Sequence, residues 1–529
     1  MAEQHVVVIG AGIGGLVSAL LIAARGVPVT LVEAAATPGG KMRQVHVGGA
    51  AIDAGPTVFT MRWVFEQILH AAGASLADLP PLTPLQVLAR HAWRGHDARL
   101  DLHADPAQSE QAIGDFAGAA EARRYAAFCR QARAVYQALE GPYIRGPRPS
   151  LLSMSRGLGP SGLATLAGLG PFSSLWHSLG RHFQDPRLRQ LFGRYATYCG
   201  ASPWQAPATL MLVAQVELDG VWSVQGGMHA VAQSFADMAA RKGVALRYNA
   251  PCERIVVRGG KACGVVLAGG EELPADAVVF NGAPQALADG LLGDAVQRAT
   301  PPLPRHKRSL SAVTWSAHAA TNSDTGGFPL TRHNVFFDDD YSAEFDDIFG
   351  RRRLPRAGTV YVCAQDRSDH TTLAAGTPER LLCLVNAPAD GDHPNFDALE
   401  TETCLQHSLA LLRGCGLAVD LKPQDPLNTH TTTPADFNRL FPASGGALYG
   451  QATHGWMSSF QRPGSATAVK GLFLAGGGVH PGPGVPMAAL SGQLAAEALM
   501  AHLASTSPSR RVAISGGTLT PSATTAATP

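Results

Sequence analysis

The first 33 residues alternate apolar runs with a glycine-rich turn. Residues 5–9 (HVVVI) predict a short buried strand, residues 10–15 (GAGIGG) a turn, and residues 16–25 a helix that ends at Gly26. Residues 29–33 predict the next strand. Residues 6–24 are also 19 uncharged residues in a row, close to the length of a membrane span. Four glycines would weaken a spanning helix, and no Lys or Arg precedes the run, so we predict a βαβ unit.

Strand patterns return late in the chain. Residues 229–241 read as a helix and 244–248, 253–258, 262–267 and 278–280 as strands, with a strand at 472–475 and a helix at 486–504 near the end. This return after a long excursion predicts a discontinuous nucleotide domain.

Residues 62–140 mix helical and strand patterns in no clear order. The acidic run 338–347 and the basic run 351–353 predict solvated faces or a salt-bridged loop. Residues 505–529 are rich in Ser, Thr, Ala and Pro, and we expect disorder there.

Residues 141–184 contain no Asp or Glu in 44 positions, but they carry four arginines among Leu, Phe, Gly and Pro. Pro160, Pro171 and repeated glycines argue against a spanning helix. Two interpretations stay open. The stretch is either a buried helical subdomain or a surface that touches one leaflet of a membrane.

Composition narrows the class of protein. The 529 residues correspond to roughly three to four domain equivalents. Charged residues are only 16%, hydrophobic residues 46% and the net charge +1, which suits apolar cargo and gives no electrostatic basis for binding nucleic acid. Eight cysteines show neither CxxC pairs nor zinc-ligand spacing, so we expect reduced cytosolic thiols and no metal site.

Gly10, Gly12 and Gly15 form GxGxxG between a predicted strand and a predicted helix. This context allows a tight turn, close approach of a pyrophosphate and donation from the helix N-terminus. Glu33 ends the second strand, where a carboxylate accepts from ribose hydroxyls and repels a 2′-phosphate. Gly39, Gly40, Lys41 and Arg43 follow and favour FAD over NAD, because they add backbone and cationic donors near the pyrophosphate. A second glycine motif at 157–162 follows no strand and contains a proline, so we expect no nucleotide there.

Near the C-terminus, LFLA is followed by a glycine-rich loop at 476–484 and a helix that starts at about Pro486. Such a helix aims its N-terminus at a ligand. In a flavoenzyme this would be the N1–C2=O edge of the isoalloxazine, which gains negative charge on reduction. The other interpretation is a turn that serves packing alone.

These segments together carry a family resemblance. VVVIGAGIGGL, GGKMR and DAGPTVF at the front, QDPRLRQLF, VQGGMHAVA and YSAEFDDIF in the middle, and LFLAGGGVHPGPGVPMAALSG at the back resemble the phytoene desaturase family of carotenoid desaturases over about residues 5–504. The ending GGGVHPGPGVPM departs from the usual GAGTHPGAGIPG. It looks like the hydroxycarotenoid 3,4-desaturase branch, also called methoxyneurosporene dehydrogenase.

The resemblance implies an α/β fold of the amine-oxidase-like kind. It would have a discontinuous Rossmann-like FAD-binding domain of the glutathione-reductase type at 1–75, 225–300 and 465–504. A mixed-sheet substrate domain would occupy 76–140 and 301–464, and a helical, membrane-associated subdomain 141–224. The implied reaction introduces a C3–C4 double bond into an acyclic 1-hydroxy or 1-methoxy carotenoid by hydride transfer to the flavin.

The expected cofactor-binding residues combine the motifs with the resemblance, which also implies that the backbone of Cys252 lies against the adenine. They are Gly10, Gly12, Ile13, Gly14, Gly15, Glu33, Gly40, Lys41, Arg43, Pro56, Thr57, Cys252, Gly476, Gly477, Pro486 and Met487. No catalytic residue is identified, because the polyene itself stabilises the cation left by hydride loss. His480 is a candidate proton acceptor or a structural donor, and His454 and Trp456 lie nearby in the sequence.

Other functions on the same fold stay open. They are a phytoene-type desaturase, a redox-neutral carotenoid isomerase, a flavin amine oxidase and a cofactor-free Rab-escort-like protein; an intact flavin loop argues against the last. The expected partners are the membrane surface and either a quinone or oxygen as electron acceptor. We expect a peripheral protein on the cytoplasmic side of the inner membrane.

Overall fold

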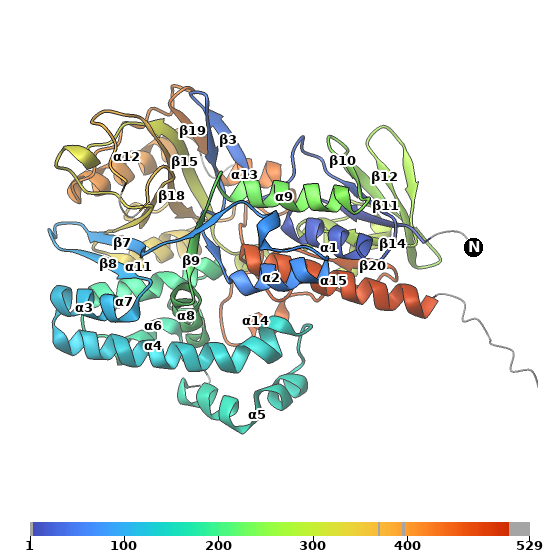
Figure 1. Cartoon of the computed structure of the whole chain (residues 1–529), viewed down its shortest axis with the longest axis horizontal. Helices are drawn as coiled ribbons and strands as arrows, with labels where there is room; N and C mark the ends of the chain where they lie inside the picture. The colour runs from blue at the N-terminus through green and yellow to red at the C-terminus, as the bar shows by residue number, and fades with distance from the viewer. Residues whose placement is uncertain (1–3, 171, 369–370, 394–396, 507–529) are drawn as a thin grey trace, which may run out of the picture.

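A parallel sheet of five short strands holds the glycine-rich loops in the computed structural model, which describes residues 4–170, 172–368, 371–393 and 397–506 (Figure 1). The strand order β10-β2-β1-β14-β20 joins three distant parts of the chain, and every neighbouring pair is parallel. The strands are β1 (Val6–Ile9), β2 (Val29–Val32), β10 (Ala245–Arg247), β14 (Ala277–Phe280) and β20 (Leu472–Leu474). The predicted strands at both ends of the chain are therefore confirmed.

The two faces of this sheet are covered by different elements. In β1, Val6 and Val8 face a core shared with helices, whereas Val7 and Ile9 face a core shared with a second sheet, as the two-residue period of a strand requires. The helices are α1 (Ile13–Ala23), α2 (Arg62–Ala71), α9 (Met228–Arg241) and α15 (Val485–Thr506). The second sheet has β11 (Cys252–Arg258), β12 (Lys261–Leu267) and β13 (Glu272–Pro274), with the short helix α10 (Pro284–Ala288) nearby.

Helix α1 begins at Ile13, three residues before its predicted start, and so includes Gly14 and Gly15. A Cβ at Gly15 would lie 2.0 Å from the Gly10 carbonyl oxygen, and one at Gly492 of α15 would lie 2.3 Å from the Gly14 carbonyl oxygen. Glycine at these positions therefore lets α1 pack closely against its own loop and against α15.

A mixed seven-stranded sheet forms the other end of the molecule. Its order is β19-β15-β18-β17-β16-β7-β8, antiparallel except for the β16–β7 pair. Its strands are β7 (Val87–Trp93), β8 (Arg99–His103), β15 (Ser311–Ala319), β16 (His333–Phe337), β17 (Val360–Ala364), β18 (Glu379–Ala387) and β19 (Thr429–Thr432). Helices here are α11 (Tyr341–Phe345), α12 (Ala398–Gly414) and α13 (Pro434–Leu440), whereas the short α14 (Ser458–Gln461) lies beside the end of α4 (Ala119–Leu139). Small sheets that join the two ends use β3 (Gln44–Val47), β4 (Ala50–Asp53), β5 (Phe59–Thr60), β6 (Leu82–Pro84) and β9 (Val221–Val224).

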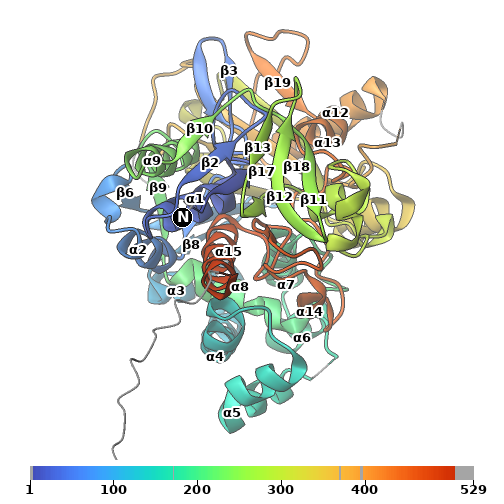
Figure 2. The ribbon, with the colours of Figure 1, turned by 90° about the vertical axis from the view of Figure 1, so that its right-hand side faces the viewer.

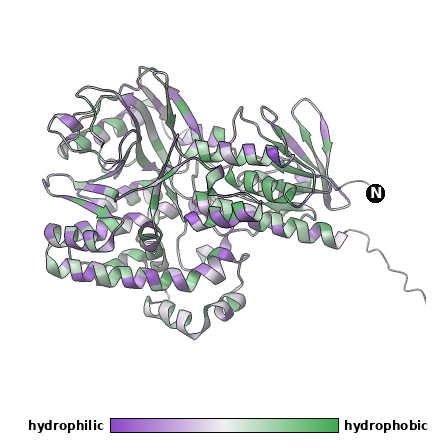
Figure 3. Ribbon diagram, viewed as in Figure 1, coloured by the Kyte–Doolittle hydropathy of each residue, from purple (hydrophilic) through white to green (hydrophobic). Residues whose placement is uncertain are grey.

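A helical layer lies below both large sheets in the view of Figure 1. It consists of α3 (Pro106–Ala117), α4 (Ala119–Leu139), α5 (Leu151–Gly168), α6 (Leu175–His182), α7 (Pro186–Gly193) and α8 (Leu212–Leu218). Figure 3 shows α3 and α4 with mixed hydropathy, whereas α1 is mostly apolar. Helices α3 and α4 share one core with α6 to α8 and with strands β7, β8 and β16, so this core spans the predicted boundary between the substrate domain and the helical subdomain. The division itself stays a prediction.

Helix α5 carries the second glycine motif and is kinked at Gly159, which has φ 61. Pro160 follows inside the helix and removes one backbone donor. In the part of the chain that the structure describes, no helix is both long and apolar enough to cross a membrane.

The structure also tests the predictions for the charged runs at 338–353 and for the end of the last helix. Asp347 is buried and pairs with Arg351 and Arg353, so the acidic and basic runs form a salt-bridged loop. Helix α15 continues to Thr506, two residues into the predicted tail, and residues 507–529 lie outside the described residues.

Candidate functional site

The loop between β1 and α1 presents backbone donors. No side chain caps Gly12 at the start of α1, and the first turn contains no acidic residue, so the N–H groups there remain available to an anion. The Glu33 carboxylate lies at the same edge, where it accepts from Ala11 N at 2.6 Å and Ala35 N at 2.8 Å. This donor set and its neighbouring carboxylate fit the pyrophosphate and ribose of a dinucleotide.

The chain returns to Glu33 at residues 247–252. Glu33 N donates to the Arg247 carbonyl at 2.9 Å, and Ala250 N donates to the Glu33 carbonyl at 2.8 Å. Cys252 follows at the start of β11, and its thiol points to the Arg254 carbonyl at 3.6 Å. Burial raises the pKa of this thiol to about 11, which makes it inert at neutral pH.

The loop at residues 39–43 touches the glycine loop through its backbone. Gly39 N donates to the Ala11 carbonyl at 2.8 Å, and a Cβ on Gly40 would lie 3.2 Å from the Gly12 Cα. The two cations of this loop point elsewhere. Lys41 Nζ donates to the Leu448 carbonyl at 2.5 Å, and Arg43 Nη2 donates to Thr432 Oγ1 at 2.9 Å. Contact of these cations with a pyrophosphate stays a prediction.

Lys41 reaches the segment at residues 441–449. Its ammonium group donates to the Leu448 carbonyl, and burial, followed by repulsion from Arg462, lowers its pKa to about 8. The residue keeps exposed surface.

Arg462 fastens the C-terminal glycine loop to that segment. Its guanidinium is buried and donates to the carbonyls of Tyr449 at 3.0 Å, Gln451 at 2.7 Å and Gly477 at 3.4 Å. Gly476 N donates to Ser491 Oγ of α15 at 3.2 Å. Pro486 and Met487 then form the first turn of α15, which contains no acidic residue. Sequence reasoning missed Arg462, because nothing in RPGSA distinguishes it from a surface arginine.

The histidines near this loop make hydrogen bonds with backbone groups. His480 is 1% exposed, its Nε2 lies 3.0 Å from the Gly146 carbonyl, and burial lowers its pKa to about 4. His454 Nε2 accepts from Ser202 N at 3.0 Å, and burial lowers its pKa to about 4 as well. Trp456 is 46% exposed and meets the Phe172 ring edge-on at 5.8 Å. The contacts of His480 match its interpretation as a structural group.

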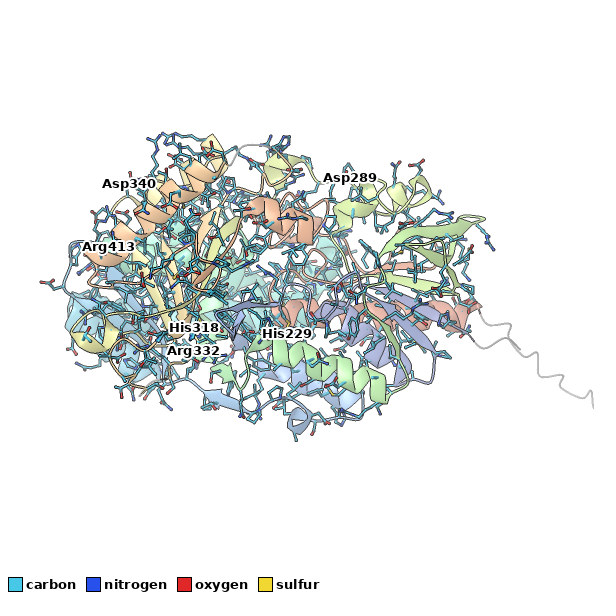
Figure 4. The ribbon with its side chains drawn as sticks, turned by 90° about the horizontal axis from the view of Figure 1, so that it is seen from above. His229, Asp289, His318, Arg332, Asp340 and Arg413 are labelled. Atoms are coloured by element: carbon cyan, nitrogen blue, oxygen red, sulfur yellow. The ribbon has the colours of Figure 1, made fainter. Side chains whose placement is uncertain are left out.

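The DAGPT segment links the two ends of the molecule. Asp53 Oδ2 accepts from Met228 N at the start of α9, and its backbone exchanges two hydrogen bonds with the Gln365 side chain. A cavity of about 330 Å³ opens behind Asp53, between Gln44, Arg332 and Gln365. Figure 4 shows this junction from above, with His229 at the start of α9. No residue of the two glycine-rich loops lines this cavity.

Thr57, the last residue of that segment, begins a polar connection. Its Oγ1 lies 2.7 Å from the Tyr361 hydroxyl, which also lies 2.7 Å from His333 Nδ1. Burial lowers the pKa of His333 to about 3, so the imidazole is neutral. Arg194 continues this connection, because its guanidinium carbon lies 5.6 Å from the centre of the Tyr361 ring.

Arg194 opens a short 3-10 helix (Arg194–Cys199) that follows α7. The three-residue period of this helix puts Tyr195 and Tyr198 on one side, and both hydroxyls donate to Glu217 of α8, at 2.6 Å and 3.0 Å. Arg194 Nη1 donates to the Tyr198 hydroxyl at 3.0 Å. The sequence held one signal for this cluster, a single carboxylate in the apolar run 210–218, and our reading missed it.

Charge within the cluster is balanced. Burial raises the pKa of Glu217, although its tyrosine donors and Arg194 oppose the shift. Burial opposes the charge of Arg194, but Tyr198 and Glu217 outweigh it and hold its pKa above the ordinary value. The site therefore combines an anion-binding glycine side with a buried polar side.

Comparisons with known proteins agree with this architecture. Residues 13–500 match the family model described as flavin containing amine oxidoreductase. The chain is 66% identical to hydroxyneurosporene desaturase of Rubrivivax gelatinosus over 99% of this chain and 98% of that protein. It is 46% identical to hydroxyneurosporene desaturase of Cereibacter sphaeroides over 95% and 98% of the two chains. The solved cyclohexylamine oxidase from Brevibacterium oxydans is 18% identical with a TM-score of 0.56, covering 95% of this chain and all of that one, which shows similarity of fold.

Proposed function

The chain belongs to the flavin containing amine oxidoreductase family, in its carotenoid desaturase branch, and from this premise we propose that it forms the C3–C4 double bond of acyclic 1-hydroxy or 1-methoxy carotenoids. It is an FAD-dependent oxidoreductase that desaturates carotenoids. The observation that carries the proposed substrate is the 66% identity to a hydroxyneurosporene desaturase over almost the whole of both chains.

The finer division of the fold is also a proposal. The segments at 1–75, 225–300 and 465–504 form the Rossmann-like, glutathione-reductase-type FAD-binding domain. Residues 76–140 and 301–464 form the substrate domain, and 141–224 the helical subdomain. The five-stranded parallel sheet supports this proposal, because its strands come only from the first three segments.

We assign FAD to the two glycine loops. The open N–H groups at the start of α1 hold the pyrophosphate, Glu33 the ribose, and the segment around Cys252 the adenine. The loop at Gly476 and Gly477, with Pro486 and Met487, would hold the flavin ring, and Pro56 and Thr57 would also contact the cofactor. When bound, FAD supplies the acceptor for a hydride from the carotenoid.

The chain itself excludes water and fixes the polyene. Hydride loss beside a polyene leaves a delocalised cation, so the protein needs no strongly basic group. The N-terminus of α15 stabilises negative charge on the cofactor side. No second dinucleotide motif follows a strand in this sequence, which favours a membrane quinone or oxygen as the final electron acceptor.

The reaction is tested with holoenzyme, 1-hydroxyneurosporene and a quinone in liposomes, without NAD(P). A product two mass units lighter with a red-shifted absorption spectrum is expected. An unchanged mass with a new isomer ratio would assign the protein to the isomerases. Turnover of phytoene alone would assign it to another desaturase branch, and turnover of a small amine to the amine oxidases.

We also propose that α5 and its surroundings touch the membrane on the cytoplasmic side. This helix protrudes from the helical layer in Figures 1 and 2. Large apolar side chains there are exposed, namely Leu151 (55%), Leu152 (61%), Leu163 (45%), Phe172 (77%) and Trp456 (46%). With no acidic residue at 141–184 and four arginines, this surface suits an anionic leaflet.

A carotenoid is taken from the bilayer, because each buried CH₂ contributes about 0.8 kcal/mol against release into water. Flotation with vesicles of neutral lipid, and of neutral lipid with phosphatidylglycerol, measures this association. We expect binding that detergent reverses and salt weakens. Absence of binding to both kinds of vesicle would remove this proposal and leave the desaturase assignment untouched.

A further inference from the structure

Arg194 is an enclosed cation with unused donors. Its guanidinium lies over the rings of Tyr198 and Tyr361, at 5.1 Å and 5.6 Å, and makes no ion pair within 4.0 Å among the described residues. One of its five N–H groups donates to the Tyr198 hydroxyl. The other donors have no protein acceptor in the described part of the chain.

Arg194 lies among aromatic side chains of other elements. Tyr198, Tyr361 and Tyr449 each keep partial exposure, as Arg194 does, and the charge of Arg194 opposes the rise in pKa of all three hydroxyls. Arg194 is therefore neither paired with a carboxylate nor fully withdrawn from solvent.

Contacts link Arg194 to two segments that the proposed function assigns to the cofactor, residues 53–57 and 476–484. On one side the Tyr361 hydroxyl meets Thr57 Oγ1. On the other, Gly200 at the end of the Arg194 helix packs so closely on Tyr449 that a Cβ would lie 2.9 Å from it, and the Tyr449 carbonyl shares Arg462 with Gly477. Arg194 is thus joined to both loops by short chains of contacts.

A polyene hydrocarbon has no hydrogen-bond acceptor for the N–H groups of Arg194. Tyr198 and Glu217 offset the charge of Arg194, but its open N–H groups still favour a further acceptor. The proposed substrate carries one oxygen, on C1, and only three bonds separate it from C3. When C3–C4 lies at the flavin, the oxygen must lie close to the flavin as well. Both a hydroxyl and a methoxy oxygen accept a hydrogen bond, and an arginine only donates.

We propose that Arg194 is the specificity-determining residue that donates a hydrogen bond to the C1 oxygen of the carotenoid. The inference rests on the proposed function, because that oxygen belongs to its substrate. Glu217 acts as a positioning residue. It holds Tyr198 and Tyr195 and offsets the charge of Arg194, which would otherwise oppose the cation that hydride loss leaves on the polyene.

The test compares Arg194→Met with wild type on two carotenoids, 1-hydroxyneurosporene and neurosporene, which lacks the oxygen. Dissociation constants come from the carotenoid absorption shift and kcat/KM from product formation. The variant should lose about 10- to 100-fold in affinity and kcat/KM for the hydroxylated carotenoid. Its affinity for neurosporene should change less than about threefold. Arg189→Met is the matched control, since Arg189 lies 4.0 Å over the Trp176 ring outside the cluster, and it should leave the ratio of the two affinities unchanged.

Equal losses on both carotenoids, or no loss on either, would overturn the inference. A changed flavin absorption spectrum with an unchanged affinity ratio would also overturn it, because Arg194 would then face the cofactor. Wild type that fails to desaturate 1-hydroxyneurosporene refutes the proposed function instead. If Arg194→Met does not fold, Arg194→Lys keeps the charge but not the planar fork and should give an intermediate ratio. Tyr198→Phe keeps the ring and frees one arginine donor, and a change of the ratio below about threefold is expected.

Discussion

Under the proposed function, the glycine side binds the cofactor through backbone groups, whereas the polar side binds the substrate through side chains. On the glycine side the functional groups are backbone N–H groups at the ends of short strands, and the side chains around them only have to be small. On the polar side the functional groups are side chains from four separate elements, as in Arg194, Glu217, Tyr361 and Thr57. Backbone binding depends on a local conformation, whereas side-chain binding depends on how distant elements dock.

The comparison predicts different kinds of damage. A change on the glycine side should remove the cofactor while the distant sheet remains folded. A change on the polar side should alter which molecule binds, or how well the two sides hold together. The following changes separate these outcomes.

Gly12→Val should abolish FAD binding. A Cβ at Gly12 would lie 2.8 Å from Asn281 Nδ2, and the remaining side chain would fill the approach to the N-terminus of α1. The measurement is flavin absorbance per mole of purified protein, with circular dichroism to confirm folding. Gly168→Val, at an exposed helical position with no atom within 4 Å of the added Cβ, should retain full flavin content. A folded Gly12→Val protein with normal flavin would contradict the assignment.

Arg462→Met should lower the free energy of unfolding by about 3 kcal/mol, because three buried carbonyls lose a charged donor. Urea denaturation of the holoenzyme measures this loss. Arg439→Met removes an arginine whose side chain is 76% exposed and paired only with Asp436, and should cost less than about 0.5 kcal/mol. Similar losses in the two variants would mean that Arg462 does not fasten the two sides.

The double change Leu152→Asp and Phe172→Asp should weaken vesicle binding at least about tenfold, because two exposed apolar side chains no longer enter the leaflet. Flotation measures the effect. Leu399→Asp with Leu427→Asp is the matched control, since both leucines are 72% exposed away from α5. Flavin content should be normal in both proteins, which would confine the membrane contact to the helical layer. Equal loss of binding in the control would move the contact elsewhere.

His480→Gln should reduce the loss of stability in mild acid by about 1 kcal/mol between pH 7 and pH 5.5. Burial lowers the folded pKa of His480 to about 4, below the ordinary 6.5, so the unfolded chain takes up the proton first and stability falls from pH 6.5 towards pH 4. The measurement is the slope of unfolding free energy against pH. His70→Gln, at an exposed helical position, is the control for the substitution itself and should leave the unfolding free energy at pH 7 within about 0.5 kcal/mol of wild type. An unchanged slope in His480→Gln would show that the fold does not lower the pKa of this imidazole.

The sequence predicted the glycine side well. The βαβ unit, the return of strands at 245–280 and the final strand and helix lie where apolar periodicity predicted them. The start of α1 was placed three residues late, because its first turn is made of glycines that carry no helical pattern. For residues 141–184 the sequence showed an apolar stretch without acidic residues, but it did not show which leucines face outward.

What the sequence determined by itself is the set of local conformations. GxGxxG after a strand, Pro486 at a helix start and the spacing of Glu33 specify backbone geometry within a few residues, and backbone donors follow from that geometry alone. Only the tertiary structure decided the rest. Arg194 meets Thr57 through Tyr361, and Arg462 joins Tyr449 to Gly477, across separations of 13 to more than 300 residues. Such contacts depend on the docking of sheets and helices through buried side chains, which no local spacing records.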